Sequence, residues 1–163
     1  MRAQAQKLSA LGSNVYVKIP ITNTHGKSSA QLVAQLSSLG IRVNVTAITT
    51  VEQVAVVIPS LDSSPGAFVS VFAGRIADAG VDPLPIVRES VDLLRGLPLV
   101  ECIWASPREV LNAVQADQVG CQVITMTSDL IAKLGLLGKD LTQYSLETVE
   151  MFRRDAVAAG YTL

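Results

Sequence analysis

The sequence contains few cysteines and a single histidine, and these shortages exclude several kinds of site. Cys102 and Cys121 lie in apolar, strand-like runs and form no Cys-x-x-Cys pair, so a disulfide framework or a zinc site is not expected. We expect both to be small buried residues of a cytoplasmic protein in a reducing compartment. His25 has no second histidine to share a metal with, so we do not expect a metal site.

The sequence also lacks a charge excess and a long hydrophobic run. Its 13 basic and 14 acidic residues give a net charge of −1 and are scattered, so no nucleic-acid or membrane partner is expected. No apolar run approaches the roughly 20 residues of a transmembrane helix. The first twelve residues are amphipathic and lack the continuous apolar region of a signal peptide.

The sequence is rich in aliphatic residues. Apolar residues make up 49% of the 163 positions, while aromatic residues make up only 4%. This composition is typical of a parallel α/β core whose strands are buried on both faces. The length suits one domain, and we expect a single domain over residues 1–163.

Short apolar runs alternate with helical periods along the whole chain. Strands are predicted over residues 15–19, 42–47, 68–72, 100–104 and 122–126. Helices are predicted over residues 2–11, from Thr24 or Ser28 to 39, 50–61, 84–95, 106–119, 128–136 and 145–160. We expect a turn at 62–66 and a loop over 73–83. Strands that alternate with helices at this spacing predict a parallel sheet.

The strongest helix start in the sequence is at Ser106. A serine is followed by Pro107 at the first helical position and by Glu109 three residues after the cap, which is a capping-box pattern.

Two architectures fit this pattern. One is a doubly wound open sheet, and the other is part of an eight-stranded β/α barrel. Five strands do not close such a barrel, so periodicity alone favours the open sheet. However, polar residues recur near the carboxyl ends of several strands on one face, where a barrel has its shared interior and its ligand site. These residues are Lys18, Asn44, Thr46, Ser70 and Glu101. Their recurrence favours a barrel fragment.

Lys18 stands in the apolar run "NVYVKIPIT" (14–22). Burying its ammonium is costly unless the group is paired or loses its proton. One interpretation is a strand-end lysine that reaches solvent or pairs with Glu101. The other is an amine kept uncharged in an apolar site, able to form a Schiff base with a carbonyl while Asn44, Thr46 and Ser70 hold the substrate.

Three motifs in order resemble the transaldolase family, which includes the smaller fructose-6-phosphate aldolases. "VYVKIPIT" resembles the Schiff-base strand of that family, "GIRVNVTAITT" resembles the next strand, and "FVSVFAGRIADAG" is similar to its Ser-x-Phe-x-x-Arg-Ile segment. "ASPREVLNAVQADQVGCQVITM" and "SLETVEMFRRDA" continue in register. The resemblance covers residues from about 3 to 160.

The resemblance implies a site and a chemistry. Lys18 would be the Schiff-base lysine and Thr46 a catalytic neighbour, while four residues would bind the substrate: Asn44, Ser70, Phe72 and Arg75. The implied fold is a (β/α)8 TIM barrel that assembles into oligomers and needs no cofactor. The implied activity is that of a transferase or lyase of carbohydrate metabolism, as in the pentose phosphate pathway, which makes or breaks a carbon–carbon bond of a ketose or ketose phosphate.

The sequence departs from the family pattern at its start. The three strands that precede the lysine strand in the family are missing, so only about five βα units are expected. A second polypeptide or further copies of the chain would complete the barrel, or Met1 is an internal start. The alternative is a truncated, non-catalytic relative.

A second departure concerns the phosphate site. Where the family carries Ser-Phe-Arg or Ser-Phe-Lys, this chain has Ile103, Trp104 and Ala105. Arg75 alone is a weaker clamp, so we expect a substrate with a smaller or absent phosphate. Arg108, expected on the following helix, could compensate.

Glu101 has two interpretations. It meets solvent or Arg42 at the amino end of its strand, or it is an interior carboxylate that takes part in proton transfer near Lys18.

Overall fold

The structure, a computed structural model, describes residues 1–61 and 65–162. The chain forms two compact units, Met1–Thr127 and Ser128–Leu163. The single domain predicted over residues 1–163 therefore stays a prediction. The turn predicted at 62–66 falls largely on residues outside the described ranges.

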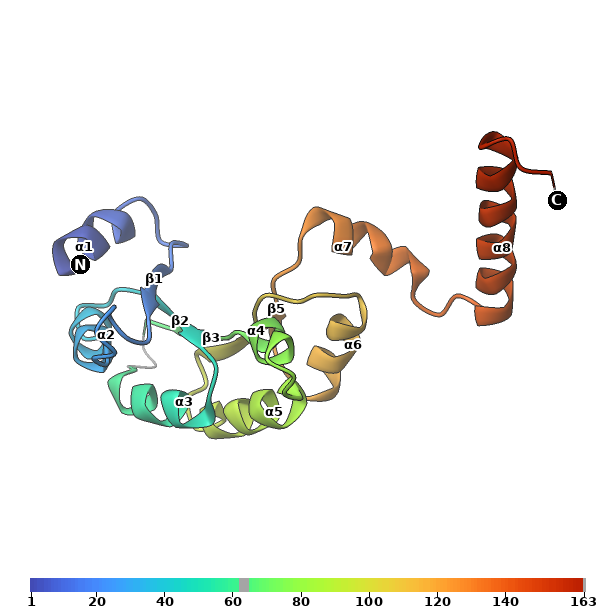
Figure 1. Cartoon of the computed structure of the whole chain (residues 1–163). Coiled ribbons are helices and arrows are strands. Elements are labelled where there is room, and N and C mark those ends of the chain that lie inside the picture. Colours follow the sequence, from blue (N-terminus) through green and yellow to red (C-terminus); the bar gives the residue numbers. More distant parts are fainter. Residues whose placement is uncertain (62–64, 163) are drawn as a thin grey trace. The chain divides into compact units, whose positions relative to one another are not determined.

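The first unit is built around five parallel strands (Figure 1). They are β1 (Val17–Pro20), β2 (Val43–Ile48), β3 (Ala67–Val71), β4 (Val100–Trp104) and β5 (Val123–Ile124). The helices of this unit are α1 (Arg2–Ser9), α2 (Ala30–Ser37), α3 (Val51–Val57) with the 3-10 turn η1 (Ile58–Ser60), α4 (Ala73–Asp78), α5 (Pro83–Leu94) and α6 (Leu111–Gln118). All five strands were predicted from the sequence, although β5 is much shorter than expected.

The order of the strands decides between the two predicted architectures. The sheet runs β1-β2-β3-β4-β5, so each strand pairs with its neighbour in the chain and every pairing is parallel. A doubly wound sheet reverses its strand order at a switch point, whereas a β/α barrel does not. Figure 1 shows α2, α3 and α5 along one side of the sheet. The chain is therefore a partial TIM barrel, as the sequence predicted.

The core lies between the sheet and these helices. Alternate strand residues point to that side, and we call this the helix face of the sheet. Its members are 5% exposed or less: Val17, Ile19, Val43, Val45, Ala67, Val69, Val71, Val100, Cys102 and Trp104. They pack against buried residues of the helices, including Val33, Leu36, Val54 and Val87.

Helix α3 begins where its sequence dictates. The Thr50 hydroxyl accepts a hydrogen bond from the Gln53 backbone N–H at 3.3 Å, and the Gln53 side-chain oxygen accepts one from the Thr50 N–H at 3.2 Å. This reciprocal pair satisfies two backbone donors that the helix leaves open.

The predicted helix start at Ser106 is wrong. Ser106 has a φ of +62°, which is not the extended geometry of a helix cap, and α6 begins only at Leu111. The Asn112 side-chain oxygen accepts hydrogen bonds from the backbone N–H groups of Arg108 (2.7 Å) and Glu109 (3.2 Å). These bonds hold residues 106–110 as a loop.

The loop predicted over 73–83 is also partly wrong, because residues Ala73–Asp78 form α4. The helix forms despite Gly74 because its first turn packs tightly on the chain that follows β4. A Cβ at Gly74 would lie 1.6 Å from the Ser106 carbonyl oxygen.

The second unit contains α7 (Ser128–Lys133), the turn η2 (Leu134–Leu136) and α8 (Leu141–Ala158). Helix α8 was expected to begin at Ser145, but Asp140 caps it, accepting a hydrogen bond from the Gln143 N–H at 2.8 Å. Lys139 and Glu147 form an ion pair at the same end.

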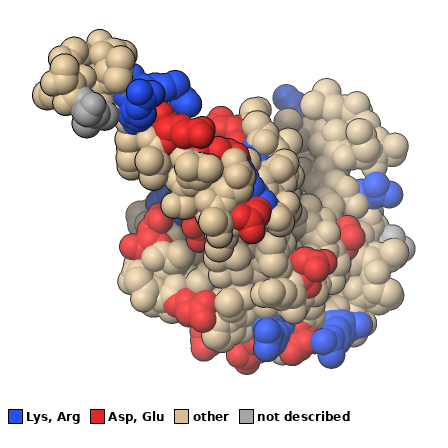
Figure 2. Space-filling view, turned by 90° about the vertical axis from the view of Figure 1, so that its right-hand side faces the viewer, with Lys and Arg blue, Asp and Glu red and all other residues tan. Residues whose placement is uncertain are grey.

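The charges of the molecule are dispersed. On the face drawn in Figure 2, basic and acidic side chains are interspersed and most of the surface is uncharged. Within residues 1–61 and 65–162, no helix has the length and apolarity needed to cross a bilayer.

Candidate active site

The face of the sheet opposite the helix face carries the residues predicted to do chemistry. We call it the inner face. In register across the strands, Lys18 lies beside Asn44, Asn44 beside Phe68, and Phe68 beside Glu101. The next row along the strands contains Pro20, Thr46, Ser70 and Ile103.

Lys18 lies on β1 between two buried neighbours. Val17 and Ile19 are each 3% exposed on the helix face, while Lys18 is exposed on the inner face. The lysine also borders a 110 Å³ cavity that is lined by residues of α1. The exposure of Lys18 agrees with the interpretation of a lysine that reaches solvent, and the enclosed amine stays a prediction. The lysine is exposed because five strands leave the inner face open, whereas a closed barrel would enclose it.

Asn44 and Ser70 are brought together from neighbouring strands. The Ser70 hydroxyl donates a 2.7 Å hydrogen bond to the Asn44 side-chain oxygen, and Ser70 is only 2% exposed. This bond fixes the orientation of the Asn44 amide, whose NH₂ group is left to donate elsewhere. Asn44 is directly beside Lys18, about 5 Å away at the level of the backbone.

Thr46 is held by an irregularity in β2. Ala47 has a φ of +62°, and the pairing of β2 with β3 slips between Val45 and Ile48. Thr46 is 6% exposed, and its hydroxyl has no hydrogen-bond partner among the described residues. Such a buried hydroxyl usually bonds to water or to a ligand, so Thr46 is available to one.

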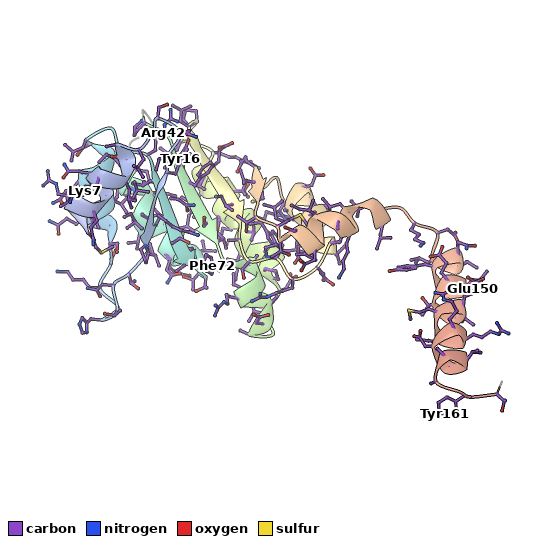
Figure 3. The ribbon with its side chains drawn as sticks, turned by 90° about the horizontal axis from the view of Figure 1, so that it is seen from above. Lys7, Tyr16, Arg42, Phe72, Glu150 and Tyr161 are labelled. Carbon is purple, nitrogen blue, oxygen red and sulfur yellow. The ribbon has the colours of Figure 1, made fainter. Side chains whose placement is uncertain are left out.

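Phe72 and Arg75 lie just past the carboxyl end of β3. Phe72 is half-buried and precedes α4, while Arg75 lies on α4 itself and is exposed. In Figure 3, Tyr16 and Arg42 lie at the end of the sheet where the strands begin, and Phe72 lies at the end where they finish. Phe72 and Arg75 therefore lie at the end of the sheet where barrels and open sheets bind ligands.

Two residues at this end were not recognised as a pair in the sequence. Arg108, in the loop after β4, forms two hydrogen bonds with the Asp78 carboxylate on α4, one of them 3.1 Å from Nε to Oδ1. Thirty residues separate them, so no local pattern could reveal the contact. The sequence predicted Arg108 on a helix, whereas the loop lets it reach Asp78 on α4 and pass over Gly74, the residue before Arg75.

Glu101 does not approach Lys18. Three strand spacings separate the two residues, roughly 14 Å. Glu101 is exposed and lines a 310 Å³ cavity together with Tyr16 and Arg42. The ring of Phe68, the neighbour of Glu101 on β3, has its centre 4.3 Å from the centre of the Tyr16 ring. This is the amino-end placement that one interpretation expected, and proton transfer by Glu101 stays a prediction.

The cysteines lie on the side of the sheet away from this chemistry. Cys102 is fully buried and Cys121 is half-buried. The Cys121 thiol donates to the Cys102 carbonyl oxygen at 3.3 Å. A hydrogen bond with the Cys121 side chain, and burial in addition, raise the pKa of the Cys102 thiol, so it is a protonated core residue. No group of three or more metal-ligating side chains occurs in the described part of the chain.

The chain is similar to known proteins over most of its length. Residues 1–163 match the family described as Transaldolase/Fructose-6-phosphate aldolase. The chain is 34% identical over 149 residues to a probable transaldolase of Desulforudis audaxviator, covering 90% of this chain and 64% of that protein. It is 31% identical over 147 residues to a probable transaldolase of Nitrosopumilus maritimus, covering 88% of this chain and 61% of that protein.

The chain thus spans less than two thirds of the length of these relatives. The match over all 163 residues agrees with the five-stranded partial barrel and with the order of the motifs along it. The chain belongs to the Transaldolase/Fructose-6-phosphate aldolase family.

Proposed function

We propose that the protein makes or breaks a carbon–carbon bond of a ketose through a Schiff base on Lys18, as a class I aldolase or a transaldolase. The observation that carries this proposal is that Lys18 lies beside Asn44 on one face of the sheet, with the Ser70 hydroxyl bonded to Asn44. An amine with adjacent hydrogen-bonding side chains is the arrangement that carbinolamine chemistry requires.

The proposed reaction uses these groups in order. The Nζ of Lys18, once deprotonated, adds to the ketone carbon, and the ketone oxygen then leaves as water to give an iminium ion. The hydroxyl on the β carbon gives its proton to water and becomes the carbonyl of the departing aldehyde. The bond between the α and β carbons breaks, and its electron pair passes to the iminium, which leaves an enamine. Asn44 holds a substrate hydroxyl, and the unpartnered Thr46 hydroxyl binds the water that is released or consumed.

The substrate extends toward the carboxyl end of β3. There Phe72 offers an apolar wall and Arg75 a cation for an anionic or polyol end. The enamine then has two possible fates. It adds to another aldehyde, which is the transferase outcome, or it is protonated and hydrolysed to release a ketone, which is the lyase outcome.

Completion of the site requires cover for the inner face. The face is open in a chain that spans less than two thirds of its relatives. We propose that the working form is a homo-oligomer or a complex with a partner chain, in the cytoplasm, in which the inner face is enclosed. Enclosure would also desolvate Lys18 and favour its uncharged form.

A second candidate function follows from the exposure of Lys18. An exposed lysine lacks the apolar enclosure that a Schiff-base amine uses for its activation. On this view the chain is a non-catalytic relative or a subunit that keeps the motif residues and acts only when a partner is bound.

Borohydride trapping separates the two candidates. The chain is incubated with dihydroxyacetone and sodium borohydride, and the adduct is located by peptide mass spectrometry. We expect a reduced adduct on Lys18 that Lys18→Arg abolishes and that Lys27→Arg, in the exposed loop after β1, leaves unchanged. The experiment is repeated at increasing protein concentration, because high concentration favours assembly. Absence of an adduct at every concentration would support the non-catalytic candidate.

A further inference from the structure

The side chain of Arg108 is held against α4 rather than left free. It lies across Gly74, where a Cβ would approach Arg108 Nε to 3.1 Å, and it ends on the carboxylate of Asp78. Nε and one terminal nitrogen of Arg108 each bond to a different oxygen of Asp78. A guanidinium bound in this two-point manner presents the same edge that would otherwise bind a phosphate or carboxylate.

The backbone around this pair is fixed on both sides. The Gly74 N–H approaches the Ala105 carbonyl oxygen at 3.4 Å, and Gly74 fits closely against the Ser106 carbonyl. The Arg108 N–H is bound in turn by the Asn112 side chain at 2.7 Å. The loop after β4 and the helix after β3 are thus held together at the carboxyl ends of the two strands.

The pair changes the charge that a ligand would meet there. Asp78 lies one helical turn after Arg75, so the two cations and one carboxylate sum to a single positive charge. A phosphate dianion is best held by guanidinium groups that can both donate freely. Ile103, near the carboxyl end of β4, and Ala105, just after β4, are 5% and 6% exposed and offer no further charge.

We propose that Asp78 is a specificity-determining residue that occupies Arg108 and thereby disfavours a phosphate at this end of the site. The favoured substrate is then a ketose whose end near Arg75 carries hydroxyl groups and no phosphate. The preference for this substrate rests on the proposed function. The effect of Asp78 on anion binding does not, because it can be measured without turnover.

The pair is weak enough for a substitution to be informative. Its side chains are 46% and 51% exposed, and exposed ion pairs of this kind contribute at most about 1 kcal/mol to stability. Asp78→Asn should therefore leave the fold intact, which its melting temperature would verify. Asp92→Asn is a matched control, because it removes one carboxylate from another exposed Asp–Arg pair, that with Arg95 on α5.

The first measurement is the binding of inorganic phosphate by calorimetry. We expect Asp78→Asn to bind phosphate at least about fivefold more tightly than the unmodified chain, since a nearby negative charge is removed and a guanidinium is freed. Asp92→Asn should not change binding, and Asp78→Glu should retain the weak binding. The gain should disappear when Arg108→Gln is added to Asp78→Asn.

The second measurement compares borohydride trapping with fructose 6-phosphate and with fructose. Asp78→Asn should shift the preference toward the phosphorylated ketose by a similar factor. Unchanged or weaker phosphate binding in Asp78→Asn would overturn the inference, and weaker binding would show that Asp78 holds Arg108 in place for phosphate. Absence of any lysine adduct in the unmodified chain would overturn the proposed function, while the phosphate titration would still decide the role of Asp78.

Discussion

The two faces of the five-stranded sheet carry different side chains on the same strands. On the helix face, Val17 and Val45 are buried among aliphatic neighbours. On the inner face, Lys18 is exposed and Asn44 is half-buried and bound to Ser70. The helix face therefore supplies most of the apolar burial that stabilises the unit, and the inner face supplies most of the polar groups. Substitutions on the two faces should separate stability from activity.

The largest effect is expected on the inner face, at Lys18. Lys18→Met should lower ketose turnover at least about a thousandfold, because the proposed covalent intermediate cannot form. The free energy of unfolding should change by less than about 0.5 kcal/mol, since the side chain is exposed. Turnover of the assembled protein and urea unfolding would be measured together. Retained turnover would remove Lys18 from the mechanism.

The reverse is expected in the core beneath the helix face. Leu36 on α2 is fully buried, so Leu36→Ala should lower the free energy of unfolding by about 3 kcal/mol. Leu39→Ala is the control, because Leu39 is 49% exposed and should cost less than about 0.5 kcal/mol. Urea denaturation would compare the two. Equal costs would contradict the assignment of the core to this face.

Glycine substitutions test the close contact between α4 and the loop after β4. Gly74→Ala places a Cβ against the Ser106 carbonyl and should destabilise the protein by about 2 kcal/mol. Gly96→Ala should change stability by less than about 0.5 kcal/mol, because a Cβ there meets none of the described atoms within 4 Å. Thermal unfolding of both variants is the measurement. A neutral Gly74→Ala would show that the contact is looser than described.

A smaller effect is expected from the hydrogen bond between the two strands. Ser70→Ala removes the donor to Asn44 and should lower the free energy of unfolding by about 1 kcal/mol. Trapping efficiency at Lys18 should also fall, because the Asn44 amide loses its fixed orientation. Ser38→Ala removes an exposed hydroxyl that donates to the Gln35 carbonyl within the same helix turn, and it should alter neither property.

The smallest effect is expected at Glu101. Because Glu101 lies three strands from Lys18, Glu101→Gln should change turnover by less than about twofold. A larger loss of turnover with trapping intact would instead support the proton-transfer role considered from the sequence. The comparison requires the same oligomeric state in both proteins.

Much of the fold could be read from local patterns. The apolar run at 100–104 corresponds to β4, and the helical period at 84–95 corresponds to α5, because the spacing of apolar residues that each element buries is visible within a few positions. The start predicted at Ser106 failed for the opposite reason. Asn112 and the packing of Gly74 outweighed a favourable capping sequence.

The candidate site was predictable only in part. The residue types and their alternation placed Lys18, Asn44, Thr46 and Ser70 on one face, and the register of the strands agrees. The exposure of Lys18 was not predictable, because it depends on what covers the inner face. The pairing of Arg108 with Asp78 depends on a contact across thirty residues.

The amino-acid sequence was sufficient for the five strands, for most of the helices and for the alternation of residues across the sheet, because these follow from short-range periodicity. Only the tertiary structure decided the strand order, the environment of the lysine and the partner of Arg108. Those properties arise where distant segments meet, and the free energy of such contacts is set by packing and charge in three dimensions.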